Sequence, residues 1–127
     1  MRLLIIGLAG AVGALSRYGI SIGLSRIGSS TFPWGTLAVN VIGCLIIGFV
    51  MHVSLTTDAI PHQWRVAITV GFLGALTTFS TFSYETIQLI EKSAYLTALG
   101  NVGLNVVLGL CATIAGLAIG RLITGGA

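Results

Sequence analysis

Four long apolar stretches dominate the pattern of hydrophobic and polar positions along the chain. They run over residues 3–24, 34–55, 64–90 and 95–123. A membrane-spanning helix needs about 20 mostly apolar residues, so each stretch is long enough to cross a bilayer. Turn-forming and charged residues such as Pro61 and Lys92 separate the stretches. The pattern predicts an all-α integral membrane protein with four transmembrane helices, and the short breaks predict antiparallel neighbours.

The composition excludes a soluble fold. Of 127 residues, 55% are hydrophobic and only 7% are charged, whereas soluble domains carry about 25% charged residues. We therefore expect residues 1–127 to form a single membrane domain embedded in lipid. Arg2 and the apolar residues after it imitate a signal peptide, but the apolar run continues to Leu24. We expect this segment to stay as the first span.

Few residues suggest chemistry of the enzymatic or metal-binding kind. Cys44 and Cys111 lie inside apolar runs without metal-ligand spacing, which favours neither a disulfide framework nor zinc. The net charge of +3 comes from scattered residues rather than a patch, so nucleic acid is not an expected partner. No nucleophile and base pair or phosphate-binding loop is present in the sequence, and we expect no enzyme. His52 and His62 are expected to face water.

The positive charges are nearly balanced between the two sides of the predicted membrane domain. One side has Arg2, Arg65 and Arg121, and the other has Arg26 and Lys92, with Arg17 if it reaches that interface. Orientation in the membrane depends on an excess of Lys and Arg on one side. We infer that the chain inserts both ways round and that two oppositely oriented copies pair as an antiparallel, dual-topology homodimer.

Glycine is more frequent than loops require. Among the 18 glycines, Gly19 and Gly23 form one G-x-x-x-G pair and Gly116 and Gly120 form another. Small residues at this spacing let helices approach closely. The sequence leaves open whether these faces pack within one chain or between two copies.

The third span is the most unusual segment because five of the seven residues at 77–83 are Ser or Thr. Hydroxyl side chains compete for backbone hydrogen bonds and glycine weakens a helix, so a break is expected between Gly74 and Ser80, halfway across the bilayer. The carbonyls before such a break suit a cation, and the N–H groups after it suit an anion. The alternative is that the hydroxyls bond to their own helix or to neighbouring helices.

Polar stripes at four-residue spacing mark the second and fourth spans. They comprise Thr36, Asn40, Cys44, Gly48 and His52 in one, and Thr97, Asn101, Asn105, Gly109 and Thr113 in the other. Amides at this depth are costly without partners. They could serve as donors for a dehydrated anion or as hydrogen bonds between helices. Phe79 and Phe82 share a helix face beside the hydroxyl cluster, where their positive ring edges suit an anion; the alternative is that both rings pack in the core or face lipid.

Arg17 and Glu85 are the charges deepest within the predicted spans. Each costs at least about 2.5–3.5 kcal/mol there unless it is paired or hydrated. Either residue could therefore have a function, and either could also reach an interface.

The chain resembles the Fluc fluoride channels, also called CrcB, over its whole length. The string Gly71-Phe-Leu-Gly-Ala-Leu-Thr-Thr-Phe-Ser-Thr-Phe-Ser83 is the most specific match, and Trp34-Gly-Thr-Leu-Ala-Val-Asn40 supports it. The resemblance implies a fluoride-selective channel that exports fluoride passively across the bacterial inner membrane. It also implies an antiparallel dimer with two pores and a structural sodium ion at its centre.

The resemblance also assigns residues. Backbone carbonyls of Gly74 and Thr77 would hold sodium, ring edges of Phe79 and Phe82 would contact fluoride, and Asn40 would donate to the pore. Ser80, Thr81 and Thr36 are similar to polar residues along or beside that path. The family's polar track on the fourth span would fall on Asn105, with Asn101 as its second candidate. Arg17 and Glu85 match family positions without an assigned role. Several relatives have a hydroxyl where this chain has Gly109, which departs from the pattern.

Two other functions fit a small protein of this kind. A dual-topology, proton-coupled exporter needs a membrane-embedded carboxylate, and Glu85 is the sole deep acid in the sequence. A structural or assembly subunit would carry no ion flux. Passive fluoride flux favours the channel, and transport driven by a proton gradient favours the exporter.

Overall fold

The computed structural model describes residues 1–25 and 31–126, and every regular element in that part of the chain is a helix. The elements are α1 (Arg2–Ser25), α2 (Trp34–Thr56), α3 (His62–Val66), the π-helix η1 (Ala67–Leu73), α4 (Gly74–Leu76), α5 (Phe79–Glu91) and α6 (Tyr95–Ile123). The all-α prediction is confirmed. Arg26, which entered the charge comparison, lies outside the described residues.

Four helical segments are long and apolar enough to cross a membrane. They are Arg2–Ser25, Trp34–Thr56, His62–Glu91 and Tyr95–Ile123, and their ends lie within two residues of the predicted spans. Large apolar side chains cover much of the outer surface, with Leu3, Leu96 and Leu122 each more than 80% exposed. Such a surface suits lipid rather than water.

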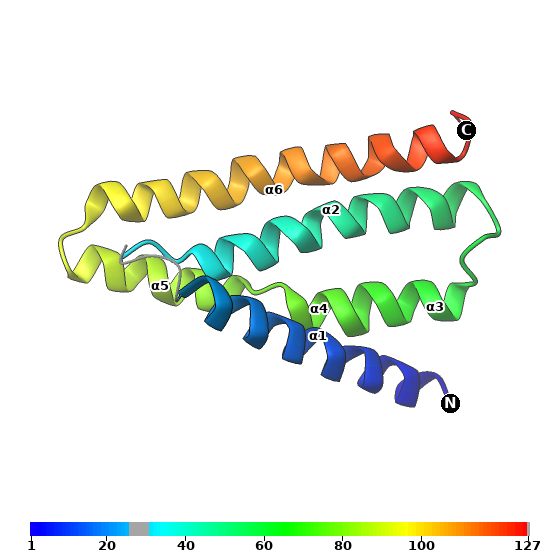
Figure 1. The fold of residues 1–127 in the computed structure, drawn as a ribbon, viewed down its shortest axis with the longest axis horizontal. Coiled ribbons are helices and arrows are strands. Elements are labelled where there is room, and N and C mark those ends of the chain that lie inside the picture. The colour runs from blue at the N-terminus through cyan, green and yellow to red at the C-terminus, as the bar shows by residue number, and fades with distance from the viewer. Residues whose placement is uncertain (26–30, 127) are drawn as a thin grey trace.

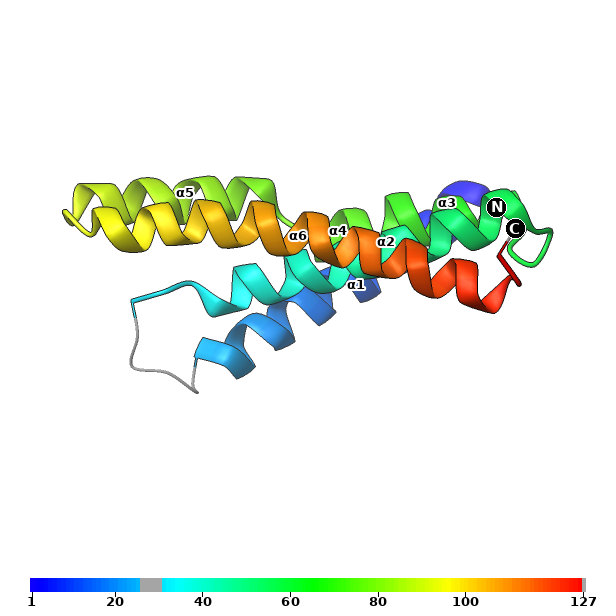
Figure 2. The ribbon, with the colours of Figure 1, turned by 90° about the horizontal axis from the view of Figure 1, so that it is seen from above.

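The four segments run back and forth, and both chain termini lie at the same end of the molecule (Figure 1). Helix α2 packs along α6, while α1 packs against η1 and α4. Seen from above, α1 crosses the other segments obliquely (Figure 2). The buried core at the centre consists of Val39, Leu73 and Leu76.

Glycines allow two of these helix contacts to be close. At the α2–α6 crossing, a Cβ atom on Gly48 would meet the Thr113 carbonyl, and one on Gly116 would meet the Leu45 carbonyl. Where α1 meets η1, a Cβ atom on Gly13 would meet the Phe72 carbonyl. At these positions even one methyl group would push the backbones apart.

The two G-x-x-x-G pairs differ in their surroundings. Gly116 packs against α2 and Gly120 against His52, so this pair serves packing within one chain. A Cβ atom on Gly19 or Gly23 would meet nothing within 4 Å. Their face of α1 is therefore free of contacts from the described part of the chain. His52 is half-buried and within hydrogen-bonding distance of the Thr124 hydroxyl at 3.1 Å, whereas His62 is exposed.

Candidate functional site

The third span-length segment is interrupted at Thr77 and Thr78. Helix α4 ends at Leu76, both threonines have extended backbone, and α5 begins at Phe79. The Thr77 N–H and hydroxyl both donate to the Leu73 carbonyl, at 3.0 and 2.9 Å. The Thr78 hydroxyl accepts from the Thr81 N–H at 3.1 Å and so caps α5. The clustered hydroxyls thus supply the partners that a helix end requires.

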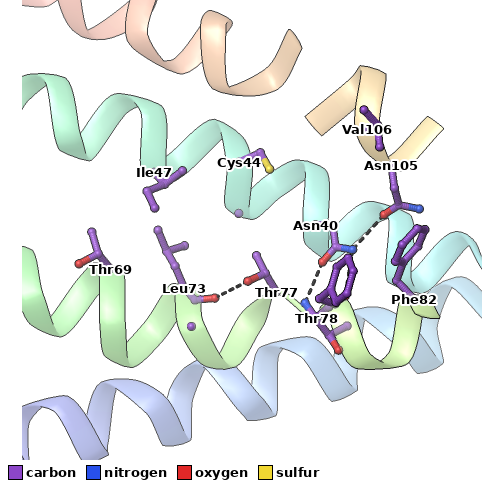
Figure 3. A pocket seen from close by; sticks show the side chains of 13 residues that line it. Asn40, Cys44, Ile47, Thr69, Leu73, Thr77, Thr78, Phe82, Asn105 and Val106 are labelled. Carbon is purple, nitrogen blue, oxygen red and sulfur yellow. Dashed lines mark hydrogen bonds between the residues drawn. The ribbon is translucent and has the colours of Figure 1, made fainter. Parts of the chain in front are cut away.

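The Asn40 side chain of α2 bonds the interrupted backbone at Thr78 (Figure 3). Its Oδ1 accepts from the Thr78 N–H at 2.8 Å, and its Nδ2 donates to the Thr78 carbonyl at 3.2 Å. In a continuous helix the Thr78 N–H would donate to the Gly74 carbonyl. Asn40 therefore takes that N–H, and the Gly74 carbonyl is left without its helical donor.

The three asparagines of the chain form one amide network between helices. Asn40 Nδ2 donates to Asn105 Oδ1 at 2.9 Å, and Asn105 Nδ2 donates to Asn101 Oδ1 at 3.0 Å. Asn101, which is fully buried, donates to the Thr86 hydroxyl at 3.0 Å. We use the term amide network for Asn40, Asn105 and Asn101 together with Thr78 and Thr86 at its ends. Hydrogen bonding between helices, which the sequence left open as an alternative for these asparagines, involves all three.

A cavity of about 400 Å³ opens at the interruption (Figure 3). It brings together six of the residues predicted from the sequence, namely Asn40, Gly74, Thr77, Phe79, Phe82 and Asn105. The rings of Phe79 and Phe82 stand 5.6 Å apart between centroids and are tilted by 47°. Phe79 is 80% exposed, so its own chain supports little of the ring. Polar side chains and aromatic rings therefore line the same open cavity.

Thr36, Thr81 and Glu85 lie together around a second cavity of about 460 Å³, between α1, α2 and α5. The Thr36 hydroxyl donates to Glu85 Oε1 at 2.9 Å. Glu85 Oε2 is buried and has no hydrogen-bond partner among the described residues.

Ser80 is exposed beside the Thr78 cap, with its hydroxyl 3.4 Å from that of Thr78. Arg17 is half-buried in α1 and lines neither of these two cavities.

A family model described as CrcB-like protein, Camphor Resistance (CrcB), matches residues 4–117 of the chain. The chain belongs to the CrcB family. The proposed resemblance is thereby confirmed, and the chain is a multi-pass bacterial membrane protein.

Curated relatives match the chain over nearly their whole length. A protein of Citrifermentans bemidjiense is 48% identical over 120 residues, which cover 94% of this chain and 97% of the relative. A protein of Geobacter sulfurreducens is 45% identical over 119 residues, covering 94% and 96%. One of Clostridium novyi is 43% identical over 120 residues, covering 94% of each. All three are named fluoride-specific ion channel FluC.

Sequence reasoning missed two residues of the site in this CrcB chain. Thr78 belonged to the hydroxyl cluster but was not singled out, although it holds both Asn40 and the α5 cap. Thr86 was not considered, although its hydroxyl joins Asn101 to the Phe82 carbonyl. A signal was present, because Thr86 lies one helical turn after Phe82 and two after Phe79, on the same face.

Proposed function

We propose that this chain is a fluoride-selective ion channel that exports fluoride passively across the bacterial inner membrane. The observation that carries the proposal is the 43–48% identity, over at least 94% of the chain, to relatives named fluoride-specific ion channels. Channels of this name are transport proteins and not enzymes, in line with the sequence. We propose that two copies of opposite orientation form a homodimer, and that this dimer contains two pores.

The chemistry of the first cavity suits a small anion. Fluoride is strongly hydrated, so a pathway must replace its water with other hydrogen-bond donors. Uncharged donors can do this without holding the ion too tightly for release. The path that we propose uses the ring edges of Phe79 and Phe82 with Asn40 and Asn105, and continues along Ser80, Thr81 and Thr36.

Asn40 limits how the ion can bind. Both hydrogens of its amide are engaged, one by Thr78 and one by Asn105. An anion that takes a hydrogen bond from Asn40 must therefore replace one of these acceptors. Since Asn105 Oδ1 lies beside the same cavity, we propose that fluoride exchanges places with this acceptor and is released when the amides bond again.

Two features support an antiparallel dimer, and Thr77 and Thr78 lie halfway along the segment His62–Glu91, as an interruption at mid-membrane requires. Phe79 is 80% exposed in a single chain, and a second copy would enclose its ring. Arg2, Arg65 and Arg121 belong to segment ends at the end of the molecule that holds both termini, while Lys92 lies at the other end (Figure 1). Arg17, in the second half of α1, is nearer the end that holds Lys92, so the described charges are three against two and give no strong preference for one orientation.

The backbone at the interruption fits a sodium ion. The Gly74 carbonyl has lost its helical donor to Asn40, and Gly74 and Thr77 line the same open cavity. Neutral carbonyl oxygens at the end of a half-helix suit a monovalent cation. We propose that these carbonyls from both copies hold one sodium ion. The bound ion would offset the negative ends of the half-helices, while the chain's own residues form the fluoride path.

One observation favours a second candidate, the proton-coupled exporter. Glu85 has a buried carboxylate oxygen without a partner, and such an oxygen could bind a proton. The channel is preferred because the named relatives are channels and because Thr36 already provides Glu85 with a hydrogen bond.

Fluoride efflux from liposomes that contain the purified dimer tests the proposal. The efflux is followed with a fluoride electrode and repeated with chloride, with and without a proton gradient. We expect rapid fluoride efflux that is the same with and without the proton gradient, and no chloride efflux. Efflux that requires the gradient would favour the exporter, and dimers without any efflux would contradict both transport functions.

A further inference from the structure

Neighbouring helices hold the beginning of α5 at two points. At the first point, Asn40 of α2 bonds both backbone polar groups of Thr78. At the second point, Asn101 of α6 donates to the Thr86 hydroxyl at 3.0 Å, and this hydroxyl donates to the Phe82 carbonyl at 2.8 Å. Phe79 and Phe82 lie on the helical turn between the two points.

The amide network has a single hydrogen-bond direction. A backbone N–H can only donate, so the Thr78 N–H requires the oxygen of Asn40 to face it. The Asn40 nitrogen then faces Asn105 Oδ1, the Asn105 nitrogen faces Asn101 Oδ1, and the Asn101 nitrogen faces Thr86. Reversal of any one amide would bring two donors or two acceptors together. The backbone at Thr78 therefore determines the orientation of an amide on another helix.

Water cannot easily replace the far end of the network. Asn101 is 0% exposed, and an enclosed amide that loses its partner is strongly disfavoured. Neither Asn101 nor Thr86 lines the cavity at the interruption. Their hydrogen bond consequently acts on that cavity only through α5 and the other amides.

We propose that Asn101 and Thr86 are positioning residues for the ion pathway, an inference that rests on the proposed function. They fix the second turn of α5 relative to α6, and so fix the rings of Phe79 and Phe82 relative to Asn40. They also hold the orientation of the Asn105 amide, whose oxygen accepts from Asn40. Neither residue contacts the ion.

Thr86→Val tests this role, since valine keeps the shape of threonine and removes its hydroxyl. Fluoride efflux should fall about tenfold, as expected when a supporting contact of a binding group is lost, while the dimer elutes unchanged in gel filtration. Thr86→Ser restores the hydroxyl and should restore the efflux. Thr56→Val is the matched control, because the Thr56 hydroxyl donates to the His52 carbonyl four residues back at 2.8 Å and has no part in the network.

A measurement without transport tests the network itself. Asparagine labelled with ¹⁵N gives side-chain amide signals from Asn40, Asn101 and Asn105 alone, because the chain has three asparagines. Thr86→Val should shift the NMR signals of all three, while Thr56→Val should shift none. If Thr86→Val fails to assemble, Thr86→Cys supplies the comparison, since a thiol forms only weak hydrogen bonds.

The outcomes separate the two proposals. Unchanged efflux in Thr86→Val, with a wild-type protein that conducts fluoride, would overturn the positioning role and leave the channel intact. If the Asn40 side-chain NMR signal does not shift in Thr86→Val, the proposal that Thr86 acts on Asn40 through the amide network is wrong. A wild-type protein without fluoride efflux would overturn the proposed function and the positioning role with it, while the NMR shifts would still decide whether the network is coupled.

Discussion

The side-chain amide of Asn40 bonds both backbone polar groups of Thr78, accepting at 2.8 Å and donating at 3.2 Å. One side chain on α2 thus substitutes for the helical partners that the interrupted segment lacks. A backbone polar group without a partner is costly in an apolar environment. The interruption depends on Asn40 for its stability as well as for any contact with an ion.

Asn40→Ala should therefore lower stability as well as efflux. The substitution leaves the Thr78 N–H and carbonyl and the Asn105 oxygen without this partner, which should lower the free energy of unfolding by about 2 kcal/mol. Thermal unfolding in detergent measures the effect. Cys44→Ala, one turn further along α2, is the control and should change stability less. Equal unfolding temperatures for the two variants would mean that Asn40 is not needed to hold the interruption.

Phe79→Ala should impair fluoride passage without a loss of fold. Because the ring is 80% exposed in one chain, its removal leaves little empty space within the fold of that chain, whereas the loss of its positive edge should lower fluoride efflux by about tenfold. Phe82→Ala should have the same effect on efflux and a larger effect on stability, since Phe82 is half-buried. Liposome efflux and gel filtration give the two readings. Unchanged flux in either variant would remove that ring from the pathway.

Alanine substitution should have different effects on the stability of the single chain at Gly116 and at Gly19. Gly116→Ala should destabilise the single chain by about 2 kcal/mol, because its new methyl group meets the Leu45 backbone. Gly19→Ala should leave the single chain unaffected, since a Cβ atom there meets nothing within 4 Å. Unfolding temperature and dimer content, measured for both variants, distinguish these cases. A Gly19→Ala protein that unfolds as easily as Gly116→Ala would contradict the arrangement of α1.

Removal of sodium should loosen the dimer if the Gly74 and Thr77 carbonyls hold this ion. Purification with N-methylglucamine as the cation should lower the dimer's melting temperature and its fluoride efflux, and returning sodium should restore both. A binding ion stabilises the folded state in proportion to the logarithm of its concentration. Potassium serves as the control for ionic strength. Melting temperatures that do not depend on the cation would exclude a structural sodium site.

The sequence predicted the spans because their signal is local. Runs of apolar residues bounded by turn formers and charges gave segment ends within two residues of those observed. The interruption was also predictable, because Thr77 and Thr78 lie in a cluster of hydroxyl residues behind glycine. The Thr77 and Thr78 hydroxyls bond backbone groups that lie only three or four residues away in the sequence.

The partners across helices could not be predicted in the same way. That Asn40 bonds Thr78, and Asn101 bonds Thr86, depends on how α2 and α6 sit against α5. The π-helical form of η1 was not predicted either, because its residues are as apolar as those of an ordinary helix. The family resemblance named ion-binding residues but not the supporting role of Thr86.

The position of Asn40 in the chain has a consequence for biosynthesis. Because α2 precedes the interrupted segment, the ribosome makes Asn40 before Thr78, so the amide exists before the backbone that it caps. Asn105 and Asn101 belong to α6, which follows α5 in the chain, so the amide network closes only after α6 has been made. A nascent chain that ends before α6 can cap its own interruption, but it cannot yet fix the second turn of α5.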